Sequence, residues 1–109
     1  MIFHGPLYYK DSSDYLEVDR LIVREDHLAF QLTTTWGEYG KWSVDGKAYQ
    51  TGNEYVSEEI SSRQGSREGL PCIIRFHIHS QIDNALSLEG AWSESGERYE
   101  FEGDLEKIA

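Results

Sequence analysis

Two histidines, His77 and His79, flank a single isoleucine in the stretch RFHIHS. In a β-strand this spacing directs both imidazole rings to one face, where two ring nitrogens can reach the same metal ion. Together with Glu89 on the next apolar stretch, the pair could bind Zn²⁺ or Ni²⁺. Whether that face is inside the fold or in solvent depends on the elements that carry the histidines.

The segment around the histidines resembles the first motif of the cupin family, in which a glycine, His-x-His, an acid and a second glycine follow one another. Gly69, His77, His79, Asp83 and Gly90 occupy that order, with three residues before Asp83 and six after it. However, seven residues instead of five separate Gly69 from His77, and Asp83 stands where the family has Glu. The resemblance covers only a short part of the chain, so we do not assign the chain to this family.

Apolar and polar residues alternate along most of the chain, and this period of two is typical of β-strands. No stretch combines a helical apolar face with a helix cap. We expect strands at residues 2–9, 15–23, 27–36, 40–44, 48–51, 54–60, 71–82, 85–92 and 97–106. Turn residues separate these strands at the spacing of all-β sandwiches and barrels.

Among the turns, Asp45-Gly46 is the strongest hairpin signal, because a type I′ turn needs positive φ at both central residues. Ser95-Gly96 is expected to close the last hairpin as a two-residue turn. Residues 61–69 are polar and contain two glycines, so we expect one long mobile loop there. Residues 54–62 could form a helical turn as readily as a strand.

We expect one all-β domain, residues 1–109. About eight consecutive antiparallel strands make a meander, which usually closes into a small up-and-down barrel because closure removes the exposed sheet edges. A two-sheet β-sandwich is the alternative. The strand order in the N-terminal half stays open because two apolar sets compete for the core face, namely Leu16, Val18 and Ile22 against Tyr15, Leu21 and Val23.

The last hairpin sets a register for the C-terminal strands. A two-residue turn at Ser95-Gly96 brings core face to core face, with three predicted pairs: Trp92 with Tyr99, Gly90 with Phe101, and Leu88 with Gly103. The preceding hairpin keeps this match only if its turn has three residues, Asp83 to Ala85. The pairs predicted there are Phe76 with Trp92, Ile78 with Gly90, and Ser80 with Leu88.

This register places both histidines on the outer face, with His79 facing Glu89 and His77 facing Ala91. An outer sheet face has no cavity that excludes water and no second set of groups to orient metal ligands. We therefore predict no metal site, although His77 and His79 remain candidate ligands, and we predict no cofactor.

The core face mixes bulky aromatic residues with glycine, which either relieves crowding between strands or leaves a pocket. Eight-stranded barrels such as lipocalins and streptavidin can hold one small apolar ligand. The predicted architecture is similar to lipocalins and avidins, hence calycin-like, and Gly90-Ala91-Trp92 looks like the lipocalin Gly-x-Trp. We expect a non-catalytic protein that binds an apolar or aromatic small molecule in its interior. The predicted ligand-binding residues are Trp42, Phe76, Ile78, Ser80, Leu88, Gly90, Trp92, Tyr99, Phe101 and Gly103.

The formal net charge of −10 disfavours binding to nucleic acid and to anionic membranes. It also suggests an alternative function, an acidic interaction module of inhibitor or immunity type. Such a module would dock a basic protein through the outer face of the C-terminal strands, at Glu89, Glu100, Glu102 and Asp104. Homodimerisation through an open sheet edge is a further alternative.

Cys72 is the only cysteine, so the chain can form no internal disulfide. A free cysteine at the start of an apolar strand is typical of a buried side chain. The first residues lack the basic head and apolar run of a secretory signal, so we expect a cytoplasmic protein. No phosphate-binding loop and no serine elbow is present, and we expect no enzyme.

Overall fold

The computed structural model describes all 109 residues. It contains nine strands and one short 3-10 turn, η1 (Gly37–Tyr39). The strands are β1 (Ile2–Tyr9), β2 (Tyr15–Val23), β3 (His27–Thr35), β4 (Lys41–Thr51), β5 (Glu54–Ser57), β6 (Ile60–Gln64), β7 (Arg67–Ile82), β8 (Ala85–Glu94) and β9 (Glu97–Lys107). The chain holds no helix that is long and apolar enough to cross a membrane.

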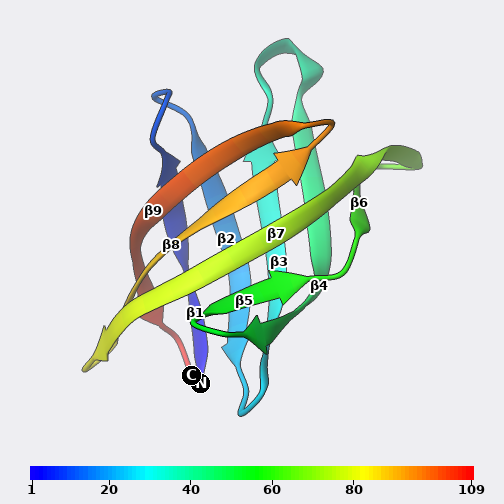
Figure 1. The fold of residues 1–109 in the computed structure, drawn as a ribbon. Helices are drawn as coiled ribbons and strands as arrows, with labels where there is room; N and C mark the ends of the chain where they lie inside the picture. Colours follow the sequence, from blue (N-terminus) through cyan, green and yellow to red (C-terminus); the bar gives the residue numbers. More distant parts are fainter.

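Consecutive strands pair as an antiparallel meander that closes on itself between β1 and β9 (Figure 1). β5 and β6 are two pieces of one broken strand, because each pairs with β4 on one side and with β7 on the other. The result is an eight-stranded barrel with one additional short strand. The prediction of a small up-and-down barrel is confirmed, and the sandwich alternative is not.

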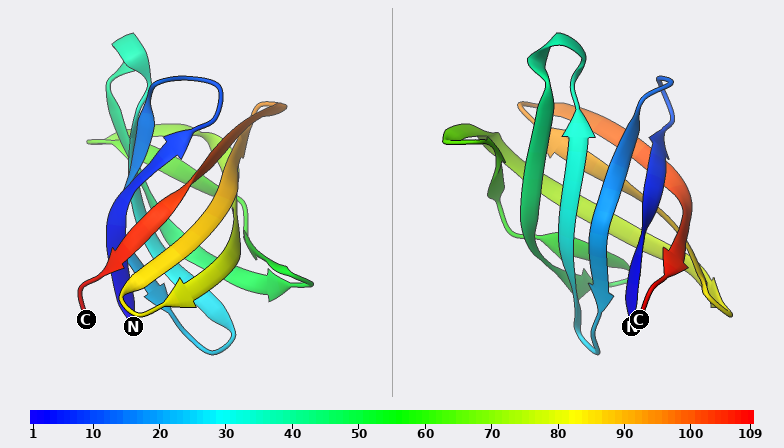
Figure 2. Two further views of the ribbon diagram at one scale, coloured as in Figure 1. Left: turned by 90° about the vertical axis from the view of Figure 1, so that its left-hand side faces the viewer. Right: turned by 180° about the vertical axis from the view of Figure 1, so that it is seen from behind.

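The two ends of the barrel differ (Figure 2). The chain termini lie side by side at one end, where the amide of Ile2 donates to the carbonyl of Ala109 at 2.7 Å. The opposite end carries the β1–β2 loop, η1, and the β6–β7 and β8–β9 turns. We call this opposite end the mouth of the barrel.

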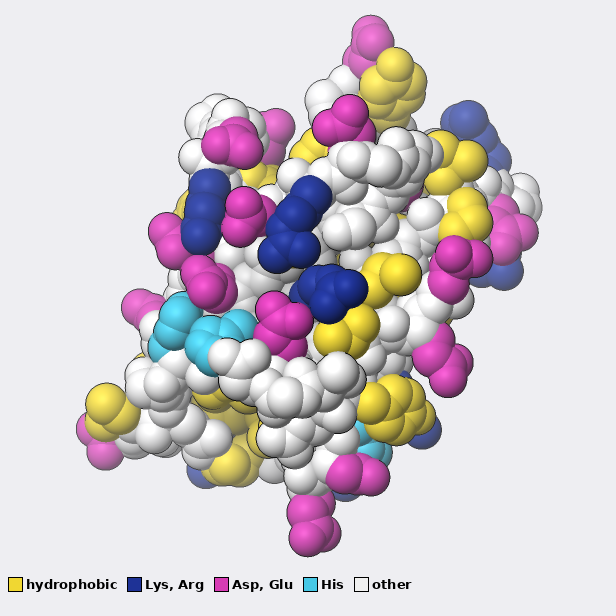
Figure 3. Space-filling model, in the orientation of Figure 1, with side chains coloured by type: hydrophobic (Ala, Val, Ile, Leu, Met, Phe, Trp, Pro, Cys, Tyr) yellow, Lys and Arg dark blue, Asp and Glu magenta, His cyan; other side chains and the backbone are white.

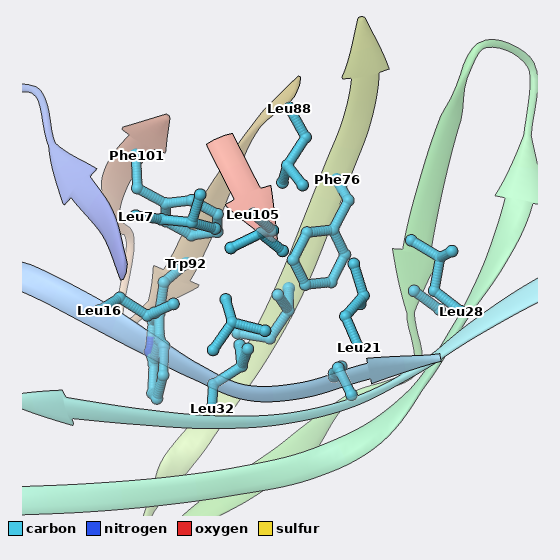
Figure 4. Close-up of a cluster of buried hydrophobic side chains, with 14 of the residues drawn as sticks. Leu7, Leu16, Leu21, Leu28, Leu32, Phe76, Leu88, Trp92, Phe101 and Leu105 are labelled. Atoms are coloured by element: carbon cyan, nitrogen blue, oxygen red, sulfur yellow. The ribbon is translucent and has the colours of Figure 1, made fainter. Parts of the chain in front are cut away.

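The middle of the barrel is a packed apolar core, to which most strands contribute their inward-facing residues (Figure 4). Leucines from β1, β2 and β3 face aromatic side chains from β7, β8 and β9. The ring of Phe76 lies 5.5 Å from that of Phe30 and 6.1 Å from that of Phe101, measured between centroids. Because this core is densely packed, it forms a rigid base for the residues at the mouth of the barrel.

A β-bulge in β2 explains its mixed apolar pattern. Asp19 is an extra residue between Val18 and Arg20, which pair with adjacent residues of β3. An extra residue reverses the alternation, so Leu16 and Val18 before the bulge and Leu21 after it are all fully buried. Both competing sets of apolar residues therefore contribute to the core, each on its own side of the bulge.

The predicted β8–β9 register is confirmed. The predicted β7–β8 register was wrong, by two residues up to Ile78 and by one residue from Ser80 onward. Asp83 and Asn84 alone form the turn, and His79 is an extra, bulged residue in β7. Phe76 consequently faces Gly90 instead of Trp92, and His77 faces Glu89 instead of Ala91. The extra residue that is needed to keep core face against core face is therefore a bulge within β7 and not a third residue of the turn.

The bulge also corrects the predicted orientation of Ser80. Ser80 pairs with Ser87, whose two neighbours on β8, Leu86 and Leu88, are buried in the core. Adjacent residues of a strand point to opposite faces, so Ser87 and Ser80 lie on the outer face. Ser80 does not line the interior.

The prediction of a turn at Asp45-Gly46 was wrong, because β4 passes straight through both residues. Gly46 pairs with Phe30 and does not have a positive φ. A Cβ at Gly46 would lie 3.4 Å from the Phe30 ring and 3.2 Å from Ile60 Cδ1. The glycine permits close packing inside a strand instead of a turn.

The long loop predicted at residues 61–69 is instead a hairpin, in which β6 and β7 meet at a turn of Gly65 and Ser66. Residues 54–62 form no helical turn, since they belong to β5 and β6 with a break at Glu58 and Glu59. Both segments find hydrogen-bonding partners on β4 and β7, which the local sequence does not show.

Candidate functional site

A pocket of about 790 Å³ opens at the mouth of the barrel. It begins where the inward-facing rows of the strands continue beyond the packed core. We call it the mouth pocket, and its walls are Asp14, Trp36, Gly37, Glu38, Tyr39, Trp42, Ser62, Glu68, Gly69, Leu70, Glu94 and Tyr99. These residues come from both halves of the chain, so only the closed barrel assembles them.

Trp36 is the central aromatic side chain of this region. It extends the inward row of β3 past Leu32 and Thr34, both of which are buried. Its ring centroid is 5.1 Å from that of Tyr99, and it meets the buried ring of Trp92 edge to face at 5.6 Å. Trp36 thus joins the pocket wall to the core beneath it.

Trp42 forms a second aromatic wall, and polar contacts fix its position. Its indole Nε1 donates to the carbonyl oxygen of Tyr39 at 3.0 Å. The amide nitrogen of Gln64 donates to the same carbonyl at 2.8 Å, which ties η1 to β6. The guanidinium of Arg67 lies over the Trp42 ring, 5.6 Å from its centroid.

A bulge in β7 brings the backbone close to Trp42. The pairing of β6 with β7 shifts by one residue between Ser61 and Arg63. A Cβ at Gly69 would collide with the hydroxyl of Ser62 and lie 3.4 Å from the Trp42 ring. Glycine is therefore the residue that permits this wall of the pocket, and bulges of this kind often border binding sites.

Four carboxylates line the mouth pocket, namely Asp14, Glu38, Glu68 and Glu94, and no Lys, Arg or His does. None of the four forms an ion pair with a cation of the chain. Glu94 is the only half-buried one, and its Oε1 accepts a hydrogen bond of 3.3 Å from the indole of Trp92. The pocket is both aromatic and negatively charged.

Tyr9 supports the pocket from the side of β1. Its hydroxyl shares a hydrogen bond of 2.9 Å with the buried hydroxyl of Thr34. Burial raises the pKa of Tyr9 well above its ordinary value, although the bond to Thr34 opposes the rise. Its ring lies 5.5 Å from that of Trp36, so this neutral phenol helps to hold the tryptophan.

The ten predicted ligand-binding residues lie in different places. Trp42 and Tyr99 line the mouth pocket. Ile78 packs against the core, and Ser80 faces outward. Four others are buried core side chains: Phe76, Leu88, Trp92 and Phe101 (Figure 4).

The two core-face glycines among these residues leave no free space. A Cβ at Gly90 would lie 2.6 Å from the ring of Phe101. A Cβ at Gly103 would lie 3.2 Å from both the Leu7 side chain and the Pro6 carbonyl oxygen. The glycines therefore allow rings and strands to approach one another, and the open volume lies at the mouth.

The pocket includes residues that the sequence reasoning missed. Trp36 and Glu94 could have been found, because each continues an alternation already assigned to the core, after Thr34 and after Trp92 respectively. Tyr39 gave no such signal, since it belongs to a 3-10 turn that its local sequence does not mark.

The histidine pair lies on the outer face of β7 among charged residues (Figure 3). The two rings are 4.9 Å apart. Nδ1 of His77 is 2.7 Å from the carbonyl oxygen of Asn53, while Nε2 of His79 is 3.7 Å from Glu89. No group of three or more His, Cys, Asp or Glu side chains is arranged to hold a metal ion.

The predicted acidic face also lies outside the barrel. Lys10 reaches into it, with its Nζ 3.3 Å from Glu89 and 3.9 Å from Glu102. The hydrogen bond from Lys10 lowers the pKa of Glu89 below its ordinary range. Glu100 and Asp104 are exposed without an ion-pair partner.

No protein-family model matches this chain, and no curated protein matches it.

Proposed function

We propose that this protein is a non-catalytic binding protein that takes a small molecule with an aromatic or apolar body into the mouth pocket. The supporting observation is the set of aromatic side chains around one open volume of about 790 Å³: Trp36, Tyr39, Trp42 and Tyr99. Small-molecule sites are typically concave, largely aromatic or apolar, and about 300–1,000 Å³ in volume.

The pocket is also prepared in advance of binding. Trp36 rests on Trp92, and Trp42 is held by its bond to the Tyr39 carbonyl. Side chains that are already fixed lose little conformational freedom when a ligand arrives. A rigid barrel beneath a partly open mouth therefore suits reversible binding of a small, flat ligand.

Titration with N-phenyl-1-naphthylamine, a neutral dye that fluoresces when it leaves water, tests this function. We expect saturable fluorescence with one site. Trp42→Ala should weaken binding about tenfold, which is about 1.4 kcal/mol, because it removes one aromatic wall.

Tyr49→Ala is the matched control for a Tyr39→Ala variant. Both tyrosines are exposed, but Tyr49 lies on β4 opposite His27, at the end of the barrel that holds the termini. We expect Tyr39→Ala to weaken dye binding and Tyr49→Ala to leave it unchanged. Equal affinities for wild type and for both pocket variants would refute the proposal.

The acidic face supports a second candidate function, docking of a basic protein. Glu89 on β8 and Glu100, Glu102 and Asp104 on β9 project from one outer surface, with Lys10 as the paired cation. Capture of a partner from source-cell extract should weaken steeply between low and high salt. Capture that resists salt, or that survives Glu100→Gln with Asp104→Asn, would count against this function.

We also propose a reducing compartment, the cytoplasm, for this protein. Cys72 is free and 1% exposed, so the fold neither needs nor offers a disulfide. Fractionation of source cells checks this location.

A further inference from the structure

We infer that the mouth pocket selects an organic cation, namely an ammonium or quaternary ammonium group carried on an aromatic or apolar body. This inference rests on the proposed function, because it names the chemical class of that ligand. It goes further by assigning a charge to the ligand and a counter-charge to named residues.

The charge balance of the pocket walls is the first argument. Four carboxylates and no cationic side chain line the pocket. A neutral ligand would displace water from these carboxylates without replacing its hydrogen bonds, which is costly for a charged group. A cation in the same position replaces that water with a direct electrostatic attraction.

The aromatic walls are the second, independent argument. The faces of Trp and Tyr rings carry negative electrostatic potential and attract ammonium groups and guanidinium groups. Trp36 in the segment after β3, Trp42 on β4 and Tyr99 on β9 all line the pocket. Rings and carboxylates thus favour the same sign of ligand charge.

The chain already shows this preference at Trp42. The guanidinium of Arg67 lies over the indole ring, 5.6 Å from its centroid. Arg67 also donates to Oε1 of Gln64 at 3.1 Å and forms no ion pair with the carboxylates of the pocket. It therefore leaves the negative charge of the pocket available to a ligand.

Glu94 is the residue to which we assign the main counter-charge. It extends the inward row of β8 directly after Trp92, and it is the only half-buried carboxylate of the pocket. The indole of Trp92 fixes its Oε1, so the carboxylate keeps one orientation while its second oxygen accepts no bond from the chain. A partly desolvated, oriented carboxylate attracts a cation more strongly than an exposed one.

Three probes of matched size test the inference: 2-phenylethylamine, which is cationic at pH 7, neutral 2-phenylethanol, and anionic phenylacetate. Binding is followed by the NMR signals of the indole N–H groups, two of which belong to pocket residues. We expect the amine to bind about tenfold more tightly than the alcohol, and phenylacetate to bind least. Raising the salt concentration should weaken the binding of the amine and of neither other probe.

Charge-neutralising variants give the residue-level test. Glu94→Gln should reduce amine affinity about fivefold and leave the alcohol unchanged. Glu25→Gln, in the β2–β3 turn at the far end of the barrel, changes the net charge equally and should affect neither probe. Glu68→Gln, on an exposed pocket wall, provides a second variant that leaves the Trp92 contact intact.

The outcomes separate this inference from the proposed function. If the three probes bind equally, or if phenylacetate binds best, charge selection is refuted while the small-molecule site stands. Charge selection is also refuted if the neutral dye binds but none of the three probes binds at concentrations up to about 10 mM, which is about the weakest affinity expected for ligands of this size. If neither the dye nor any probe binds, the proposed function itself fails.

Discussion

At the scale of single residues, the glycines of the inner face decide how closely the barrel packs. A Cβ at Gly90 would meet the backbone carbonyl oxygen of Arg75 and the ring of Phe101. Backbone atoms of a neighbouring strand cannot move aside without disturbing the ladder. Gly90 is therefore required for the approach of β7 to β8 and not for an empty interior.

We predict that Gly90→Ala lowers the free energy of unfolding by about 3 kcal/mol, because it overpacks the core against backbone. Gly103→Ala is the control, since its nearest contacts are 3.2 Å away and include a movable leucine. It should cost about 1 kcal/mol. Urea denaturation of both variants measures the difference, and equal losses would contradict the packing argument.

Cys72 provides a pH-dependent prediction. Burial, with a smaller contribution from Glu94, raises the pKa of the thiol to about 12. The folded state therefore keeps its proton when the unfolded thiol, with a pKa of about 8.5, has lost it. This contribution to stability is fully present below the unfolded pKa and is lost as the pH rises toward the folded pKa.

We accordingly expect wild-type stability to fall by about 1 kcal/mol between pH 7 and pH 9.5 from this thiol alone. Cys72→Ala should remove that part of the pH dependence. Urea unfolding across the pH range measures both slopes. Parallel slopes for the two proteins would show that the thiol is not protected by burial.

At the scale of elements, backbone conformation and not residue type decides which dipeptide is a turn. Ser95 and Gly96 have φ values of 52° and 79°, so both central residues of the β8–β9 turn are left-handed. That is the type I′ arrangement, in which Asn is preferred over Ser at the first position. Asp45-Gly46, a better turn sequence, instead lies within β4.

Ser95→Asn should therefore stabilise the protein by about 0.5 kcal/mol, because Asn tolerates the left-handed conformation better. Asp45→Asn is the matched control, since Asn would favour a turn at a position where the chain is a continuous strand. We expect no stabilisation from it. Thermal denaturation of the two variants provides the comparison, and a gain at position 45 would be inconsistent with the continuous strand.

At the scale of the whole molecule, stability depends on closing the barrel between β1 and β9. The termini meet beside this seam, where Ile2 exchanges backbone hydrogen bonds with Ile108 and Ala109. Chain ends that lie this close can be joined by a short linker without strain. The seam needs both strands, but it does not need the chain to begin and end there.

A circular permutant that joins Met1 to Ala109 by a short glycine-serine linker and opens at Gly52-Asn53 should fold cooperatively. Gly52 lies in the exposed β4–β5 turn, where a cut breaks no core contact. A chain truncated after Glu94 should instead lose the cooperative transition, because both flanking strands lose their partner. Circular dichroism distinguishes the two. Persistence of the native transition in the truncated chain would refute the role of the seam.

Most strands, the meander barrel and the β8–β9 register followed from the sequence, because alternation is a local property of each strand. Leu88, Trp92 and Phe101 were all assigned to the core by alternation alone, and all are buried. The tertiary structure decided where alternation reverses. The bulges at Asp19 and His79 arise because paired strands must match in length and curvature, and neither residue type marks that requirement.

The site divides in the same way. Sequence alone predicted aromatic side chains on the inner face and acidic side chains on the outer face of a small barrel. It also predicted Trp42 and Tyr99 as ligand-binding residues. Only the closed barrel decided that the interior is filled at Gly90 and Gly103 and open at the mouth. Free volume is what remains after side chains from distant strands have packed together, so no single segment encodes it.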